Sequence, residues 1–229
     1  MELVVERLAC RRGGRRVFEG VSLRIAAGEA RLLRGPNGAG KSSLLRVLAG
    51  LTPAEAGSAR LGEASLDDGE TWRERVALAG HLDAVKPALS VRENLAAWAA
   101  MEGRGAATVE AALERFGLAA LAGDPAQWCS AGQKRRLGLA RLLVLRRPLW
   151  LLDEPTVSLD VGWTAVFAEA VRAHCAAGGL ALAASHVDMG FGAENAVELA
   201  PRGAPLASAP AGAAGSAGAD DPFLAEEWS

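Results

Sequence analysis

Gly35-Pro36-Asn37-Gly38-Ala39-Gly40-Lys41-Ser42 is the stretch that decides how this chain folds. A short strand-like run, residues 30–34, precedes it, and a helical pattern over residues 42–49 follows it. Glycines let the backbone curl so that successive N–H groups point at phosphate oxygens, and the next helix presents its positive end to the same oxygens. The stretch therefore fits the P-loop pattern rather than a plain glycine-rich turn. In that pattern Lys41 reaches the β- and γ-phosphates and Ser42 ligates Mg²⁺.

The composition limits the class of protein. The chain has 229 residues, enough for one substantial core or a core with a lobe attached, and its net charge of −2 gives no support to wholesale nucleic-acid binding. Cys10, Cys129 and Cys175 are odd in number and far apart, which favours a reducing cytoplasm over a disulfide framework or a zinc site. The N-terminus lacks a secretion-signal pattern, and no apolar run approaches the ~20 residues of a spanning helix. We therefore expect any membrane role to depend on a partner.

Strand-like and helical segments alternate on both sides of an all-helical stretch. Strands are expected at 2–10, 21–26, 30–34, 149–152 and 180–185, and helices at 42–49, 93–101, 107–116, 131–145 and 163–176. This order predicts an α/β core over residues 1–200, with a helical insertion at about 82–145. Residues 201–229, rich in Ala, Gly and Pro with acidic pairs near the end, are expected to form a flexible tail.

Two acidic residues follow the apolar run 149–152. A buried strand there would deliver Asp153 and Glu154 to an edge of the sheet. Beside a P-loop, Asp153 is placed to hold Mg²⁺ through water, and Glu154 to polarise the attacking water as general base. An apolar run that ends in two acids is weak evidence alone, and its specificity here comes from following a P-loop at a suitable distance.

A third motif, Cys129-Ser130-Ala131-Gly132-Gln133, resembles the LSGGQ signature of the ABC ATPase family. Cys129 stands for the leucine and Ala131 for the first glycine. Ser130 and the exposed amides of a helix start are suited to a γ-phosphate, although in isolation the pattern is a plain helix N-cap. The resemblance covers about residues 1–200. It implies a P-loop NTPase of the ABC type, with a RecA-like α/β core, an antiparallel β subdomain and an inserted helical subdomain.

The same resemblance assigns further roles. Ser158-Leu159-Asp160 resembles the D-loop that crosses to a partner subunit, and His186 resembles the switch histidine that contacts the γ-phosphate. The implied ligands are ATP and Mg²⁺, with Glu154 and His186 catalytic, and Ser42 and Asp153 at the metal. The residues expected to contact the nucleotide are Gly35, Pro36, Asn37, Gly38, Ala39, Gly40, Lys41, Ser42, Ser43, Ser130, Gly132, Gln133 and Asp160.

Two positions depart from the family pattern. The chain has no tyrosine, and the aromatic residue that stacks on adenine is replaced near Arg11 or Arg12; a guanidinium also stacks on a base, so Arg12 is expected there. Where the family has the Q-loop glutamine, the chain has His81, which is expected to act catalytically and at the metal through an imidazole nitrogen. The alternative for His81 is a loop residue without function. Phe18 is expected in the core, and His174 on the surface.

These departures, with several longer stretches, resemble the heme-exporter ATPases of cytochrome c biogenesis. The stretches are residues 8–13, Gly80-His81, 86–95, 130–136 and 148–156. The resemblance implies a peripheral protein of the bacterial inner membrane, at its cytoplasmic face, paired with membrane subunits of the heme-exporter B and C type. ATP hydrolysis would then drive heme export or release of a heme-loaded chaperone. No residue pattern points to heme binding by the chain itself, so the cargo rests on resemblance alone.

The mechanism implied by the family needs two copies of the chain, arranged head to tail so that two ATP molecules are enclosed between P-loop and signature. Three other functions remain open from the sequence. One is an ABC ATPase for another small-molecule or lipid cargo. Another is a non-transport ABC protein acting on ribosomes or DNA, which the single cassette disfavours. The last is a nucleotide-binding regulator without hydrolysis, which Lys41, Asp153, Glu154 and His186 argue against.

Overall fold

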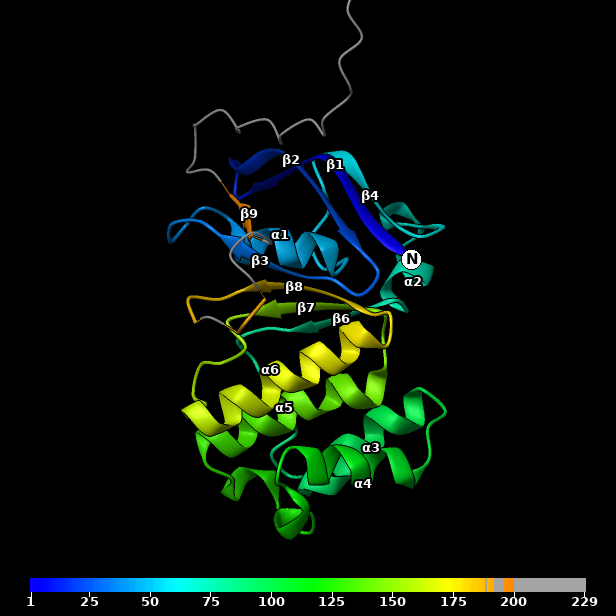
Figure 1. Ribbon diagram of the computed structural model, residues 1–229, viewed down its shortest axis with the longest axis vertical. Helices are drawn as coiled ribbons and strands as arrows, with labels where there is room; N and C mark the ends of the chain where they lie inside the picture. Colours follow the sequence, from blue (N-terminus) through cyan, green and yellow to red (C-terminus); the bar gives the residue numbers. More distant parts are fainter. Residues whose placement is uncertain (188, 192–195, 200–229) are drawn as a thin grey trace, which may run out of the picture.

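A computed structural model of the protein describes residues 1–187, 189–191 and 196–199. Figure 1 shows these residues stacked in layers: an antiparallel sheet, helix α1, a parallel sheet, and a helical region on the far side of the parallel sheet. The predicted tail, 201–229, lies outside the described residues, as does residue 200. No helix among the described residues is long and apolar enough to cross a membrane.

The parallel sheet has five strands in the order β6-β7-β8-β3-β9. Its strands are β3 (Ala30–Arg34), β6 (Val76–Ala79), β7 (Leu149–Asp153), β8 (Leu180–Ala184) and β9 (Ala196–Glu198). Because both faces of this sheet are covered, its central strands are continuous apolar runs. In β7, Leu149 and Leu151 pack on the α1 side, whereas Trp150 and Leu152 pack on the side of the other helices.

The antiparallel sheet has the strand order β2-β1-β4-β5. Its strands are β1 (Glu2–Arg12), β2 (Arg15–Ala26), β4 (Ala56–Leu61) and β5 (Ala64–Ser65). β1 and β2 pair along nearly their whole lengths, from Glu2 opposite Ala26 to Arg12 opposite Arg15. One face of this sheet covers α1 (Lys41–Leu48), whose apolar residues are completely buried between the two sheets. Each such leucine contributes about 1.5–3 kcal/mol to stability.

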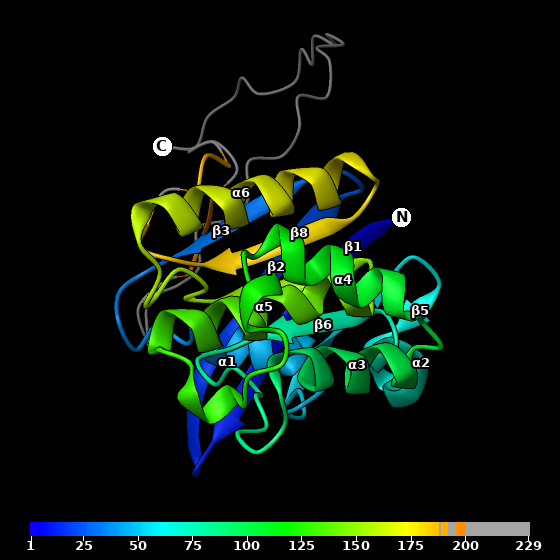
Figure 2. The same cartoon turned by 90° about the horizontal axis from the view of Figure 1, so that it is seen from below.

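The helical region lies between β6 and β7 in the chain and packs on the face of the parallel sheet opposite α1. It contains α3 (Val91–Met101), α4 (Ala106–Arg115) and α5 (Ala131–Leu145). As seen from below in Figure 2, α5 and α6 (Val161–Ala176) lie against the sheet, and α3 and α4 pack on α5. The short helix α2 (Gly69–Arg73) precedes β6.

Most elements lie where the sequence predicts them, and the main differences concern β2, β9 and the placement of His174. β2 begins at Arg15 rather than at 21, because the hairpin with β1 extends to a tight Gly13-Gly14 turn in which both glycines have positive φ. β9, which follows the predicted strands, was not expected. His174 is not a surface residue: its ring stacks on Trp150 with centroids 3.9 Å apart, and its Nε2 lies 3.1 Å from the carbonyl oxygen of Pro148. Phe18 is in the core as expected, and all three cysteines are buried and unpaired.

Candidate nucleotide site

The candidate site lies at the carboxyl edge of the parallel sheet. β3 leads into the P-loop, and β7 ends at Asp153. β8 is followed by Ser185 and His186, and β6 by Gly80 and His81. Parallel strands bring their carboxyl ends to one edge, which is where open α/β sheets bind ligands. The topology therefore gathers residues that are up to about 150 positions apart in the chain.

The P-loop backbone adopts the positive φ angles that its glycines allow without strain. Gly35, Gly38 and Gly40 have φ values of 144°, 81° and 103°. A Cβ on Gly40 would lie 3.0 Å from Cγ1 of Val17 in β2, so the loop is packed directly beneath the β1–β2 hairpin. Lys41 folds back over the loop and donates from Nζ to the carbonyl oxygens of Gly35 (2.7 Å) and Pro36 (3.2 Å). The loop is thus already curled around its own ammonium group.

Ser42 and Asp153 meet although they are 111 positions apart: the Ser42 hydroxyl donates to Oδ1 of Asp153 at 2.9 Å. A hydroxyl and a carboxylate are oxygen ligands of the kind that Mg²⁺ takes, usually together with phosphate oxygens of the substrate. Among the described residues, no group of three or more His, Cys, Asp and Glu side chains could hold a metal by itself. The two oxygens that the sequence assigns to Mg²⁺ therefore fit an ion shared with a nucleotide.

Glu154 and His186 form the next pair, with Oε1 of Glu154 3.4 Å from Nε2 of His186. Glu154 has a φ of 47°, in the left-handed region that non-glycine residues rarely adopt. Its N–H donates to the carbonyl oxygen of Ala184 at the end of β8 (2.8 Å). Such strain is concentrated at functional sites, where the surroundings hold it in place. Glu154 and His186, two of the three predicted catalytic residues, thus lie just beyond the ends of β7 and β8.

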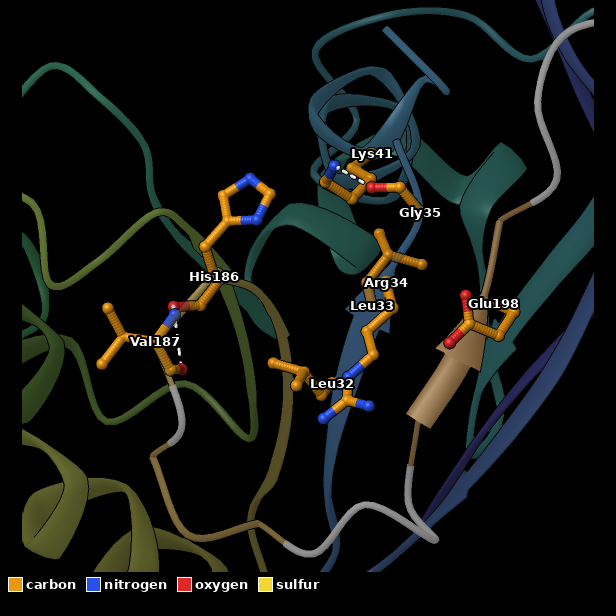
Figure 3. A pocket seen from close by; sticks show the side chains of 9 residues that line it. Leu32, Leu33, Arg34, Gly35, Lys41, His186, Val187 and Glu198 are labelled. Atoms are coloured by element: carbon orange, nitrogen blue, oxygen red, sulfur yellow. Dashed lines mark hydrogen bonds between the residues drawn. The ribbon is translucent and has the colours of Figure 1, made fainter. Parts of the chain in front are cut away.

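A cavity of about 370 Å³ opens beside these residues. In Figure 3, His186 and Lys41 lie on opposite sides of the cavity mouth, and the strand end Leu32–Arg34 lies below Lys41. Arg34 and Glu198, which the sequence did not single out, also line it. The cavity is bordered by β3, the segment after β8, and β9, so it adjoins the P-loop on the side away from Asp153.

The signature motif begins α5. The Ser130 hydroxyl accepts the Gln133 N–H (3.2 Å), and the Gln133 side-chain oxygen accepts the Ser130 N–H (2.7 Å). This is a capping box, and it leaves the Ser130 hydroxyl proton free to donate to an anion. Gly132 approaches the D-loop, because a Cβ there would lie 3.0 Å from the carbonyl oxygen of Ser158. Asp160 caps α6 by accepting the Trp163 N–H at 2.8 Å. Among the described residues, no hydrogen bond joins Ser130 to the P-loop of its own chain.

Arg12 and His81, the two departures from the family pattern, are both exposed. Arg12 ends β1 at the hairpin above the P-loop, opposite Arg15. His81 begins the loop after β6, at the same edge as Asp153, because Ala79 pairs with Leu152. No hydrogen bond or ion pair of either side chain with another described residue was found. Their roles at the base and at the metal stay predictions.

Besides Arg34 and Glu198, a further residue at the site was missed from sequence. Arg135, on α5, is buried and donates to backbone carbonyls of the loops after β6 and β7. From sequence alone, a charged residue of a capped helix is normally expected to be exposed. The hydrogen-bond partners of Arg135 could not be seen, because they lie 19 to 55 positions away in the chain. The one local signal is that a glycine, Gly138, follows one turn later, where it permits close packing.

Comparison with known proteins places the chain in a class. Residues 18–157 match the model of the ABC transporter family. The ATP-binding subunit of an ABC transporter superposes with a TM-score of 0.74 at 27% identity, covering 81% of this chain and 80% of that one. A dimeric ATP-binding cassette with bound ADP and phosphate superposes with a TM-score of 0.76 at 20% identity, over 86% and 94% of the two chains. The chain belongs to the ABC transporter family, which confirms the predicted fold class.

Curated relatives narrow the family further. The chain is 53% identical to the cytochrome c biogenesis ATP-binding export protein CcmA of Cereibacter sphaeroides, over 97% of this chain and 98% of that one. It is 54% identical to the protein of the same name from Rhodobacter capsulatus, over 87% of each. Within the ABC transporters, the chain therefore belongs to the CcmA family, and the resemblance seen in the sequence is confirmed.

Proposed function

We propose that this chain is the ATP-hydrolysing subunit of a membrane complex that drives heme export, or release of a heme-loaded chaperone, during cytochrome c maturation. The observation that carries the hydrolytic part is the meeting of Ser42 with Asp153, next to Lys41 and Glu154. The names of the curated relatives support the link to cytochrome c. The chain works at the cytoplasmic face of the inner membrane, attached through the membrane subunits.

In the proposed reaction the phosphates of ATP replace the loop carbonyls as partners of Lys41. Its ammonium then lies among the β- and γ-phosphate oxygens, together with the amides of residues 38–42 and the start of α1. Ser42 and Asp153 would hold Mg²⁺, which would neutralise charge on the phosphates. Ser43, the next residue in the first turn of α1, is placed for the same phosphates.

Glu154 accepts the proton of the attacking water, and His186 contacts the γ-phosphate. Their 3.4 Å separation lets the imidazole hold the carboxylate toward the water. His81 approaches from the end of β6, and Arg12 lies on the hairpin above the loop, where its guanidinium stacks on adenine.

A second copy of the chain completes each site in this proposal. Ser130, Gly132 and Gln133 at the start of α5 meet the γ-phosphate held by the partner copy, and Asp160 crosses to the partner. Exposed apolar side chains next to these motifs support the proposal that a second copy covers this surface. Trp128 is 73% exposed and Val161 is 87% exposed. Exposed apolar residues gathered at one place mark interaction sites.

The test replaces Lys41 by alanine in the chromosomal copy of the source cell and measures covalent heme in periplasmic c-type cytochromes by heme stain. The expected result is loss of the stain with normal levels of the variant protein, because the phosphates lose their main cation. Lys86→Ala is the matched control: the side chain of Lys86 is exposed, and its backbone makes the bonds to Asn94. Cytochrome that stays at wild-type level in the Lys41→Ala cell would overturn the heme role and leave an ABC ATPase for another cargo.

A further inference from the structure

Arg135 is a buried cation that joins the signature helix to both loops at the catalytic edge. Only 5% of its surface is exposed. Nε donates to the carbonyl oxygen of Pro155 at 2.9 Å, and Nη2 to that of Glu154 at 2.8 Å. Nη1 donates to the carbonyl oxygen of Gly80 at 2.7 Å and to Oδ1 of Asp83 at 2.9 Å. The guanidinium therefore donates four hydrogen bonds to two loops, and neither loop is part of α5.

The bond to Glu154 acts on the backbone of the proposed base. Glu154 has the strained φ of 47°, and its N–H is held by Ala184. Arg135 holds the carbonyl on the other side of the same residue, so the two peptide groups that flank the Glu154 side chain are both fixed. A strained residue keeps its conformation only when its surroundings over-determine it, and Arg135 supplies one of these restraints.

The bonds to Gly80 and Asp83 act on the loop that carries His81. They anchor the loop on both sides of His81 and Leu82, and both of these side chains project into solvent. Gly138 lies on α5 where the loop crosses: a Cβ there would be 2.8 Å from the Asp83 carbonyl oxygen. The loop and the helix are therefore in direct contact at Gly138 and bonded at Arg135.

We propose that Arg135 is a positioning residue for hydrolysis. It sets Glu154 and the His81 loop against helix α5, the same helix whose first residues meet the nucleotide of the partner copy. A shift of α5 on contact with the partner's nucleotide is thereby passed to the base of its own site. The inference rests on the proposed function, because it needs both ATP hydrolysis and the paired arrangement of two copies.

The test measures ATP binding and steady-state hydrolysis by the full chain, co-expressed with its membrane subunits, for the wild type and for Arg135→Gln. Misplacing a catalytic group by about 1 Å costs on the order of 100-fold in rate, so kcat is expected to fall by roughly 10- to 100-fold. The dissociation constant for ATP should stay within about twofold, because the phosphate contacts are made by the P-loop. Arg135→Lys should recover only part of kcat, since an ammonium cannot span the two loops as a planar fork does.

Arg141→Gln is the matched control. Arg141 is a second buried arginine of α5, and its Nη2 donates to the carbonyl oxygen of Leu78 within β6 rather than to a catalytic loop. Its loss should lower thermal stability as Arg135→Gln does, with kcat per folded molecule unchanged.

Gly138→Ala tests the same contact without removing a polar group, should Arg135→Gln not fold. The methyl group would push Asp83 away from α5 and lower kcat with ATP affinity retained. Wild-type kcat in the folded Arg135→Gln or Gly138→Ala protein would overturn the inference alone. A wild-type complex without any ATP hydrolysis would overturn the proposed function and the inference with it.

Discussion

Glu154 combines a strained backbone with a side chain close to His186, and both features belong to a single residue. Replacing it by glutamine keeps the size and the backbone but removes the ability to accept a proton. We expect Glu154→Gln to bind ATP with wild-type affinity and to lose hydrolysis by roughly 100-fold or more, the usual worth of a general base. Phosphate release and nucleotide binding measured on the same preparation check this.

Glu169→Gln is the control for this change. Glu169 is an exposed carboxylate of α6 that pairs with Arg115 at 3.2 Å, and an exposed ion pair contributes little to stability. Its variant should hydrolyse ATP like the wild type. If Glu154→Gln hydrolysed ATP at a rate within tenfold of the wild type, another group would have to accept the proton of the attacking water.

Single residues also show where sequence reasoning stops. The placement of Lys41, Ser42, Asp153 and Glu154 at one edge of the parallel sheet could be predicted, because it depends on neighbours along the chain and on the ends of strands. Arg135 could not, because its partners are backbone carbonyls in loops far away in the sequence. His174 was misassigned for a similar reason: its contacts come from strand β7 (Trp150), from the residue before it (the Pro148 carbonyl) and from the start of β8 (the Leu180 carbonyl).

At the scale of elements, the starts of α3 and α5 offer an internal comparison. Ser90 with Glu93, and Ser130 with Gln133, form capping boxes of the same geometry. Ser90→Ala and Ser130→Ala should each lower the free energy of unfolding by about 1 kcal/mol. Only Ser130→Ala should also lower ATP hydrolysis, by roughly tenfold or more, because a hydroxyl donor to the γ-phosphate is lost. Chemical denaturation and phosphate release on both variants measure the two effects separately. Equal hydrolysis by both would reduce Ser130 to a helix cap.

The C-terminal half of α6 is tied to the sheet by a histidine whose charge matters. Burial lowers the pKa of His174 below its ordinary value of 6.5. The carbonyl oxygens of Pro148 and Leu180 beside Nε2 act the other way and raise the pKa, but burial has the larger effect, so the fold favours the neutral ring. Well above pH 6.5 His174 is neutral in both the folded and the unfolded chain. As the pH falls below that value the unfolded chain binds a proton first, so stability is lost, by up to about 1.4 kcal/mol per pH unit.

We therefore expect the free energy of unfolding to fall between pH 7.5 and pH 5.5 by a larger amount in the wild type than in His174→Gln. Glutamine keeps a donor for one carbonyl but does not titrate. Urea denaturation at the two pH values gives the comparison. Parallel pH dependences would mean that other groups control acid stability.

The elements that were predicted correctly are those marked by local sequence signals, and the ones that were missed depend on partners elsewhere in the chain. The strand at 30–34 and the helix at 131–145 were predicted to the residue, because apolar periodicity, a cap and a glycine boundary all point the same way. The first part of β2 was missed because Arg15 and Arg16 are polar residues of a hairpin edge. β9 consists of three half-exposed or exposed residues. Its ladder partner among the described residues is β3, far back in the chain, so no local signal marks it.

At the scale of the whole molecule, the proposed pairing of two copies predicts a nucleotide-dependent change of mass. The Glu154→Gln protein binds ATP without consuming it, so ATP with Mg²⁺ should convert it from monomer to dimer in sedimentation velocity. Trp128→Glu in this background should weaken dimerisation by tenfold or more, because it places a charge on an apolar contact; this is roughly the 1.4 kcal/mol that corresponds to one decade. Met101, 75% exposed at the end of α3, is the control position for the same change to glutamate. A dimer equally stable with Trp128→Glu would place the contact elsewhere.

The curl of the P-loop around Lys41 bears on how fast a nucleotide enters. The Lys41 ammonium is bonded to the Gly35 and Pro36 carbonyls, so contacts within the chain support the concave form of the loop. When ATP binds, phosphate oxygens replace the carbonyl oxygens as partners of Lys41. The loop does not need to become ordered, so binding avoids the entropy cost that a flexible site has. A preformed site binds its ligand at a rate set by diffusion and orientation. Each cycle of ATP hydrolysis then begins from the same P-loop conformation.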